Sequence, residues 1–189
     1  FNRPLYDALR PKSFDEFVDQ NQFVSDSGFL GFPLKGNHLP SIILWGPPGT
    51  GKTSFARILA KDYGYNLIEL SGVNSGVADI RSSLEEAKRK SGDGLKTVVF
   101  LDEIHRYSKA QQDVLLPHIE SGLITLIGAT TENPGFNINK ALRSRVQILV
   151  FKPLSFESLV AILSRVEKVM NLNSKFLNDG VKNLLIRMA

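Results

Sequence analysis

The sequence contains no cysteine, a single tryptophan and no apolar run near the ~20 residues that a membrane-spanning helix requires. Without cysteine, the chain cannot form disulfides, bind zinc through thiolates or use a thiol nucleophile. Its start, Phe1-Asn2-Arg3-Pro4, lacks the apolar core of a signal peptide, so we expect no export and no membrane partner. A large excess of one charge is also absent, because the net charge is only +4. That surplus permits nucleic-acid binding but does not indicate it.

The length of 189 residues fits one globular domain, or a domain with a small second lobe. With 42% hydrophobic and 22% charged residues, the composition excludes a disordered chain. The chain does not begin with methionine, and it ends at Arg187-Met188-Ala189 inside an apolar periodic stretch. We therefore expect it to be a piece of a longer protein.

Apolar strands and amphipathic helices alternate along the first 151 residues. Residues 97–101 form a continuous apolar run, which is typical of a strand buried on both faces of a parallel sheet. Five strands separated by helices predict an α/β fold, a three-layer sandwich around a five-stranded parallel sheet. The expected strands are 41–45, 67–70, 97–101, 124–127 and 147–151, and the expected helices are 52–63, 77–90 and 110–119.

The pattern changes after Phe151, at the helix breaker Lys152-Pro153-Leu154-Ser155. Two helical stretches follow, over 156–170 and 174–188, and no further strand is expected. The sequence therefore predicts a core over residues 1–152 and a partial, all-helical lobe over residues 153–189. The glycine- and proline-rich residues 25–40 predict a loop or a broken helix.

The residues Gly46-Pro47-Pro48-Gly49-Thr50-Gly51-Lys52-Thr53 fit the phosphate-loop pattern GxxxxGK[ST] between a predicted strand and a predicted helix. Glycines let backbone N–H groups turn toward phosphate oxygens, and the helix N-terminus adds partial positive charge. In such loops the lysine, here Lys52, reaches the β- and γ-phosphates, and the hydroxyl, here Thr53, is a Mg²⁺ ligand. These residues, with Ser54, form the predicted nucleotide-binding loop, and ATP with Mg²⁺ is the predicted cofactor.

The third predicted strand ends in two carboxylates, Asp102 and Glu103. Strand ends are where open α/β sheets bind ligands. Asp102 is the candidate second Mg²⁺ residue, directly or through water. Glu103 is the candidate general base for an attacking water. A solvated pair at a strand end is the alternative, and the phosphate loop about 50 residues upstream argues against it.

A proline-bearing phosphate loop followed by an apolar strand ending in Asp-Glu resembles the AAA+ ATPases. The resemblance implies a polar sensor of the γ-phosphate after the fourth strand, with Thr131 as first candidate and Thr130 as second. Ser144-Arg145 resembles the Ser-Arg motif of clamp loaders, whose arginine reaches the nucleotide of a neighbouring subunit. Arg145 is thus the candidate arginine finger; Arg143 and a merely solvated basic turn are the alternatives.

A narrower resemblance rests on the run from Asp102 to Asp113, Asp-Glu-Ile-His-Arg-Tyr-Ser-Lys-Ala-Gln-Gln-Asp, and on Leu116-Pro117-His118-Ile119-Glu120-Ser121-Gly122 and Ile127-Gly128-Ala129-Thr130-Thr131-Glu132-Asn133-Pro134. These segments resemble the replication-associated recombination protein A family, which in eukaryotes includes the Werner-helicase-interacting protein and the maintenance-of-genome-stability protein. The likeness runs from about residue 10 to residue 151. It implies that residues 153–189 are a lid that stops before the family's arginine-bearing sensor-2 helix.

The N-terminal residues 9–18 resemble the part of these ATPases that packs around adenine. The candidate adenine contacts are Arg10, Pro11, Phe17 and Val18, within an adenine-side segment of residues 1–24. A plain amphipathic start to the domain is the alternative. Ser71, at the end of the second strand, stands where related enzymes carry a polar switch toward the catalytic glutamate.

The resemblance implies a DNA-stimulated ATPase that acts at stalled replication forks, in recombination and in DNA-damage tolerance, as a homo-oligomer. The implied partners are forked DNA or junctions of single strand and duplex, with a single-strand-binding protein or a polymerase as further candidates. The expected location is the cytoplasm with the nucleoid in a bacterium, or the nucleus in a eukaryote. The alternatives are a clamp-loader subunit, a Holliday-junction branch-migration motor, and a nucleotide-gated scaffold without meaningful hydrolysis.

Two other features have simpler explanations. Only three histidines and no cysteine are present, which argues against a metal site built on His105 and His118. His105-Arg106 is instead expected to be part of a coupling segment beside the catalytic pair. The basic cluster of Lys88, Arg89, Lys90 and Lys96 predicts a solvated face, with contact to a DNA backbone as the alternative.

Overall fold

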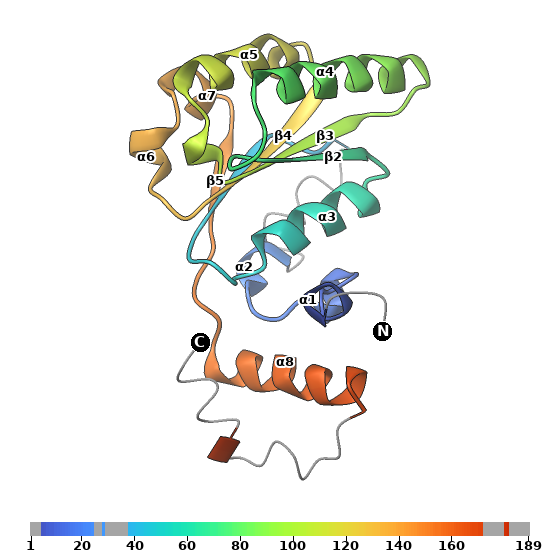
Figure 1. Ribbon diagram of the computed structural model, residues 1–189, viewed down its shortest axis with the longest axis vertical. Helices are drawn as coiled ribbons and strands as arrows, with labels where there is room; N and C mark the ends of the chain where they lie inside the picture. Colours follow the sequence, from blue (N-terminus) through green and yellow to red (C-terminus); the bar gives the residue numbers. More distant parts are fainter. Residues whose placement is uncertain (1–4, 25–27, 29–37, 172–179, 182–189) are drawn as a thin grey trace.

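Five parallel strands form the centre of the computed structural model, which describes residues 5–24, 28, 38–171 and 180–181 (Figure 1). The strand order across the sheet is β2-β3-β4-β1-β5, and every neighbouring pair is parallel. The predicted five-stranded parallel sheet is therefore confirmed. The strands are β1 (Ile42–Trp45), β2 (Asn66–Ser71), β3 (Thr97–Asp102), β4 (Ile124–Thr130) and β5 (Gln147–Val150).

Helices cover both faces of the sheet, as a three-layer sandwich requires (Figure 1). Helix α3 (Lys52–Asp62) lies on one face, and α4 (Val77–Gly92) and α5 (Lys109–Glu120) lie on the other. Successive strand residues point to opposite faces, so Ile42 and Leu44 join the core with α3 while Ile43 joins the core with α4 and α5. Because the strands are parallel, the carboxyl ends of β1, β3 and β4 lie at the same edge of the sheet. Helices cover both faces of the sheet, so this edge is the open one.

Aromatic packing holds the N-terminal segment against α3. This segment contains α1 (Leu5–Ala8), a single 3-10 turn η1 (Phe14–Glu16) and α2 (Asn21–Val24). Phe55 of α3 makes edge-to-face contacts with Phe14, Phe17, Phe23 and Phe151, at centroid distances of 5.3–6.0 Å. Such pairs each add about 0.5–1.5 kcal/mol beyond the burial of their area. Much of the phenylalanine content therefore fixes the adenine-side segment in place.

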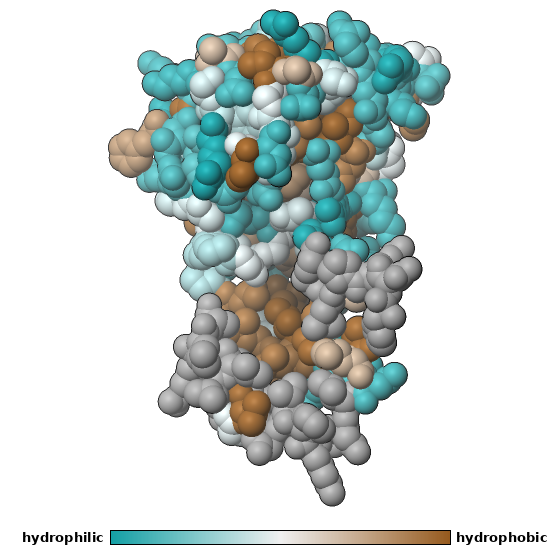
Figure 2. All heavy atoms as spheres, viewed as in Figure 1, coloured by the Kyte–Doolittle hydropathy of each residue, from teal (hydrophilic) through white to brown (hydrophobic). Residues whose placement is uncertain are grey.

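Helix α8 (Phe156–Val169) follows the sheet and lies apart from it, beyond the N-terminal segment (Figure 1). Ser155 caps its start, since its side chain accepts a hydrogen bond from the Ser158 N–H. Apolar residues gather around this helix, whereas the surface of the sheet domain is mostly hydrophilic (Figure 2). Of the second expected helix, over 174–188, residues 174–179 and 182–188 lie outside the described residues, as do 25–27 and 29–37 of the expected loop.

The linker to α8 is tied to the N-terminal segment by two neighbouring residues. Asp19 accepts hydrogen bonds from the backbone N–H of Ser155 at 2.7 Å and from its hydroxyl at 3.2 Å. Gln20 donates to the carbonyl of Lys152 at 2.7 Å and accepts from its N–H at 3.2 Å. Both have left-handed backbone conformations, with φ of 56° and 58°. Two strained residues are therefore kept in place by these four hydrogen bonds.

The sequence pattern did not predict the single-turn helices of the N-terminal segment, nor three that lie further along the described chain: η4 (Ile104–Arg106), α6 (Pro134–Asn137) and α7 (Lys140–Arg143). They are too short to show apolar periodicity, and side-chain caps stabilise two of them. Asn133 accepts from the Gly135 N–H, and Asn139 accepts from the Leu142 N–H. Among the described residues, no helix is both long and apolar enough to cross a membrane.

Candidate nucleotide-binding site

The phosphate loop connects β1 to α3 and borders a cavity of about 460 Å³ at the carboxyl edge of the sheet. The same cavity is reached by the end of β3 and by the residue that follows β4. Residues far apart in the chain thus meet at one place. The lining residues are Arg10, Pro48, Gly49, Gly51, Lys52, Thr53, Ser54, Asp102, Glu103 and Thr131.

Lys52 is buried at the base of the loop. Its ammonium donates hydrogen bonds to the carbonyl oxygens of Gly46 at 2.8 Å and Pro47 at 2.7 Å. Burial lowers the pKa of Lys52 below its usual value, and the charges of Asp102 and Glu103 oppose part of that shift. The positive charge of the Lys52 ammonium is therefore only weakly screened by water.

Two glycines of the loop have no room for a side chain. A Cβ atom at Gly46 would lie 2.3 Å from the carbonyl oxygen of Phe151, and one at Gly51 would lie 2.8 Å from Cζ of Phe17. Gly51 also has φ of 93°, a left-handed conformation that glycine adopts without steric cost. The loop is thus packed against the adenine-side segment on one side and against the exit of β5 on the other.

The acidic pair is partly buried at the end of β3. Burial raises the pKa of Asp102, as does the neighbouring charge of Glu103, while the Glu103 N–H and Lys52 act in the opposite direction. Glu103 has φ of 53° and ψ of 47°, a left-handed conformation that is uncommon and strained for a residue with a side chain. Backbone strain of this kind clusters at functional sites. The geometry therefore singles out Glu103 among the carboxylates of the cavity.

A histidine contacts the Glu103 carboxylate. Nε2 of His105 lies 3.1 Å from Oε2 of Glu103 and 3.5 Å from Oε1 of Glu132. The other ring nitrogen, Nδ1, lies 2.9 Å from the hydroxyl oxygen of Thr130. The Arg106 guanidinium is more distant, with its Nε 3.8 Å from Oε2 of Glu103. The sequence predicted that His105-Arg106 belongs to a coupling segment beside the catalytic pair, and both side chains lie beside the Glu103 carboxylate. Among the described residues, no group of three or more His, Cys, Asp or Glu could hold a metal ion.

The two sensor candidates differ in position. Thr131 lines the phosphate cavity. Thr130 is buried, and its hydroxyl accepts the N–H of Glu132 at 3.0 Å. The geometry therefore favours Thr131 for contact with a ligand and Thr130 for holding the end of β4.

Neither candidate finger arginine lines the phosphate cavity of its own chain. Arg145 pairs with Glu120 and donates to the carbonyl of Ala141 at 2.7 Å. Arg143 donates to the carbonyl of Gly135 at 2.8 Å. Both arginines are thus held on the surface near α7, so action on a nucleotide would require a second subunit.

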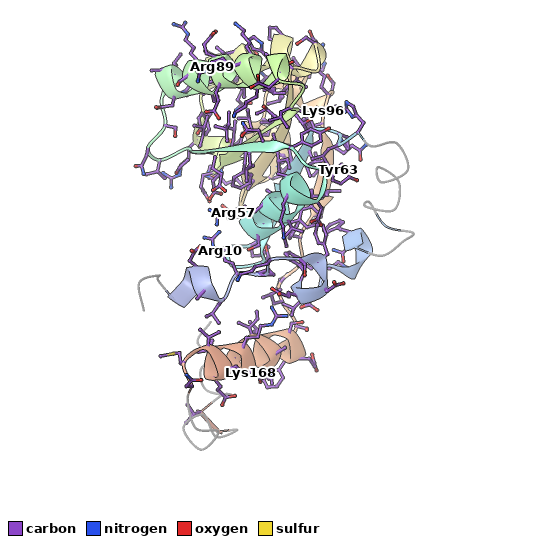
Figure 3. The ribbon with its side chains drawn as sticks, turned by 90° about the vertical axis from the view of Figure 1, so that its right-hand side faces the viewer. Arg10, Arg57, Tyr63, Arg89, Lys96 and Lys168 are labelled. Atoms are coloured by element: carbon purple, nitrogen blue, oxygen red, sulfur yellow. The ribbon has the colours of Figure 1, made fainter. Side chains whose placement is uncertain are left out.

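The four candidate adenine contacts, Arg10, Pro11, Phe17 and Val18, line a second cavity of about 170 Å³ next to the first. Arg10 borders both cavities, and it lies between α3 and α8 (Figure 3). Three further lining residues, which were not predicted from the sequence, come from α8 and the linker before it: Leu154, Ile162 and Arg165. Ile162 and Arg165 are three residues apart, a spacing that places them on one face of α8 and that could have signalled a shared role.

The residues around the two cavities fit ATP with Mg²⁺. The hydroxyl of Thr53 and the carboxylate of Asp102 are oxygen ligands of the kind that Mg²⁺ prefers, and they border one cavity with Lys52. Gly49 and Gly51 border the same cavity and have φ of 75° and 93°, the left-handed conformations that a tight phosphate loop requires of glycine. The adjoining cavity is bounded by the Phe17 ring and aliphatic side chains, which suit a purine base.

Comparison with known proteins agrees with this geometry. A model of the ATPase family associated with various cellular activities (AAA) matches residues 42–154. The chain belongs to this AAA family. Over 163 residues it is 42% identical to replication-associated recombination protein A of Escherichia coli (strain K12), covering 86% of this chain and 36% of that protein. It is 45% identical over 166 residues to ATPase WRNIP1 of Dictyostelium discoideum, covering 88% of this chain and 19% of that protein.

These AAA relatives confirm the narrower resemblance inferred from the residues after Asp102. A solved structure from Thermotoga maritima, the RuvB Holliday junction branch migration motor, superposes with a TM-score of 0.72 at 33% identity. It covers 87% of this chain and 56% of that one. The chain spans little more than a third of the length of its E. coli relative, so the comparison describes one part of such a protein.

Proposed function

We propose that this AAA domain hydrolyses ATP with Mg²⁺ and that the protein containing it couples the cycle to DNA during replication-linked recombination. One observation carries the first half of the proposal. The cavity at the carboxyl edge of the sheet is bordered at once by Lys52, Thr53, Asp102, Glu103 and Thr131. This is the set of cation, metal ligands, base and sensor that phosphoryl transfer to water requires.

Each residue has a distinct task in this proposal. Lys52 and the N–H groups at the start of α3 neutralise and orient the phosphates. Thr53 and Asp102 would hold Mg²⁺, which would supply positive charge to stabilise the negative charge of the phosphates during transfer. Glu103 accepts the proton of the attacking water at its carboxylate. Thr131 contacts the γ-phosphate and thereby reports its presence.

Adenine recognition is assigned to the second cavity. Arg10, Pro11, Phe17 and Val18 surround the base from the N-terminal segment, and Ile162 and Arg165 complete the enclosure from the lid. We propose that Arg145 acts on the nucleotide of a neighbouring subunit in a homo-oligomer, because it does not line the cavity of its own chain and pairs there with Glu120. Such a finger is worth ~10³–10⁵ in rate where it operates.

The coupling to DNA rests on the relatives rather than on the geometry. Their names, replication-associated recombination protein A and ATPase WRNIP1, support work in replication-linked recombination. We assign the action to stalled forks and damage tolerance, on forked or partly single-stranded DNA, with a single-strand-binding protein or a polymerase as candidate partners. The proposed site of action is wherever chromosomal DNA lies, which is the nucleoid of a bacterial cytoplasm or a nucleus.

The test is phosphate release by the full-length oligomeric protein with no DNA, duplex, single strand and forked DNA. We expect forked DNA to stimulate hydrolysis most. Lys52→Ala should remove nucleotide binding, and Glu103→Gln should keep binding and lower turnover by ~10²–10⁴. Glu85→Gln is the matched control, because Glu85 is exposed on α4, forms its ion pair with Lys88 and does not line the phosphate cavity. Full activity of Glu103→Gln would refute the proposed mechanism.

One alternative is favoured by a specific observation. The likeness to the RuvB motor supports a second candidate function, movement of Holliday junctions. The same purified protein should then convert a four-way junction to duplex arms in an ATP-dependent reaction. Fork-stimulated hydrolysis without junction movement would favour the first proposal, and phosphate release at background under every condition would favour a nucleotide-gated scaffold.

A further inference from the structure

His105 connects the proposed base to the end of the neighbouring strand. It lies in the turn η4, directly after the acidic pair, and its side chain is only 9% exposed. One ring nitrogen faces the Glu103 carboxylate at 3.1 Å, and the other faces the Thr130 hydroxyl at 2.9 Å. A buried ring with a partner on each nitrogen has a single orientation, so its placement is determined from both sides.

The chemistry of the partners determines which nitrogen carries the proton in the neutral ring. Nε2 faces two carboxylates, Glu103 and Glu132, which accept hydrogen bonds and cannot donate when ionised. Nε2 therefore carries the hydrogen and donates it to Glu103. Nδ1 is then an acceptor. The single hydrogen of the Thr130 hydroxyl has two acceptors within reach, Nδ1 at 2.9 Å and the carbonyl oxygen of Glu132 at 3.2 Å, and the nearer one is Nδ1. The resulting chain of hydrogen bonds runs from Thr130 through the imidazole to the base.

Ser71, which stands where related enzymes carry a polar switch toward the catalytic glutamate, makes its hydrogen bonds elsewhere. The Ser71 hydroxyl accepts the N–H of Val73 at 3.4 Å, and the Ser71 N–H donates to the hydroxyl of Ser75 at 3.1 Å. These contacts belong to the turn after β2. Among the described side chains, the shortest contact recorded for the Glu103 carboxylate is the one to His105.

We propose that His105 is the positioning residue of Glu103 and ties it to the end of β4, an inference that rests on the proposed role of Glu103 as base. Glu103 follows β3 in a left-handed conformation, so its side chain needs a partner to hold one direction. His105 supplies that partner. Thr130 directly precedes Thr131, the proposed γ-phosphate sensor in the cavity. A displacement of Thr131 would therefore move Thr130, and the His105 ring would transmit that movement to Glu103.

Three substitutions separate this role from packing. The amide N–H of a glutamine side chain lies near the position of the histidine Nε2, so His105→Gln should retain the contact with Glu103. Its kcat should stay within about threefold of that of the unchanged protein. Asn reaches only the position of Nδ1, and Leu reaches neither. His105→Asn and His105→Leu should therefore lower kcat by about 10- to 100-fold, the scale expected for a misplaced catalytic group. ATP affinity should change less than threefold in all three variants.

A double-substitution cycle tests the connection to β4. Thr130→Val keeps the side-chain shape and removes the hydroxyl that His105 faces. It should lower kcat, and adding it to His105→Leu should lower kcat no further, because both changes break one chain. Multiplicative losses, or equal kcat values for His105→Asn and His105→Gln, would overturn the proposal.

A readout independent of hydrolysis completes the test. In the full-length protein labelled with ¹⁵N-histidine and free of nucleotide, the His105 ring signals are identified by their loss in His105→Gln. Glu103→Gln should move the Nε2 signal and Thr130→Val the Nδ1 signal, whereas Glu85→Gln should move neither. Unmoved signals in Glu103→Gln would refute the positioning role even if Glu103→Gln is inactive. Moved signals together with a fully active Glu103→Gln would instead remove the proposed function and leave the contact standing.

Discussion

The ring of Phe17 lies against the backbone of Gly51, so close that a Cβ atom at Gly51 would be 2.8 Å from Cζ of Phe17. Gly51 is the residue from which α3 begins, and Phe17 belongs to the adenine-side segment. The phosphate loop and the adenine cavity therefore share a contact that exists only because residue 51 has no side chain. Their relative position depends on this contact.

Gly51→Ala should therefore lower nucleotide affinity by at least about tenfold, since it combines a left-handed φ with a clash inside the site. Gly64→Ala is the matched control. Gly64 has φ of 67°, but a Cβ atom there meets nothing within 4 Å. The left-handed φ should cost each variant about 1–2 kcal/mol of stability, and the clash with Phe17 should make the loss larger in Gly51→Ala. Only Gly51→Ala should lose binding of a fluorescent ATP analogue. Equal binding by the two variants would contradict the assignment.

Asp102→Asn should raise the melting temperature near neutral pH by a few degrees while abolishing Mg²⁺-dependent turnover. Burial raises the pKa of Asp102, and the attraction of Lys52 does not cancel that shift. The amide can still accept the Glu103 N–H that Asp102 accepts at 3.1 Å. Thermal melts at several pH values provide the measurement.

The sign of this pH dependence follows from the raised pKa. A carboxyl whose pKa is higher in the folded chain than the ordinary 3.8 stabilises the fold below 3.8 and loses that contribution as the pH rises through the folded value. The advantage of Asp102→Asn should therefore be largest above the folded pKa and disappear at low pH. A constant difference across the titration would show that the carboxylate charge is not its cause.

Arg145 should act between subunits of the full-length oligomer. Arg145→Ala alone should lower turnover by ~10³–10⁵ without weakening ATP binding. A mixture of Arg145→Ala and Glu103→Gln proteins should regain activity, because some neighbouring pairs then combine an intact finger with an intact base. Arg143→Ala should retain activity without mixing. No recovery in the mixture, with mixed oligomers shown by mass spectrometry, would place Arg145 outside the site.

Asp19→Ala should lower stability by about 1 kcal/mol, because it leaves the N–H of Ser155 without its acceptor at the start of the lid. Burial of Asp19 would raise its pKa, but hydrogen bonds from Ser155 and Ser158 outweigh that effect and lower it. A lowered carboxyl pKa gives stability above the ordinary 3.8 that is lost as the pH falls through the folded value. Asp15→Ala, an exposed change in the same segment, is the control in urea melts. Equal losses of stability in the two variants would show that the Asp19–Ser155 hydrogen bonds are not the cause.

The sheet and the phosphate loop could be predicted because their signals are local. A strand such as β3 is apolar along its whole length, and the loop pattern fixes eight consecutive positions. The turns η4, α6 and α7 could not be predicted, since four residues or fewer carry no periodicity and depend on caps such as Asn139.

The contacts of His105 illustrate what a linear sequence omits. The pairing with Glu103 spans two residues and could have been suspected, but the contact with Thr130 joins positions 25 residues apart and depends on the order β3-β4 in the sheet. The lid residues Ile162 and Arg165 were missed for a similar reason. Only the return of α8 toward the N-terminal segment brings them beside Arg10.

The close approach of Gly46 to Phe151 has a mechanical meaning. The first residue of the phosphate loop touches the last core residue before the linker to α8, so a rotation of α8 about that linker would have its pivot beside the phosphate loop. Helix α8 has 14 residues and is therefore about 21 Å long. A rotation of about 10° at this pivot would carry its far end roughly 4 Å, given the helix rise of ~1.5 Å per residue. A small rotation near the phosphate loop would therefore be accompanied by a larger displacement at the far end of α8.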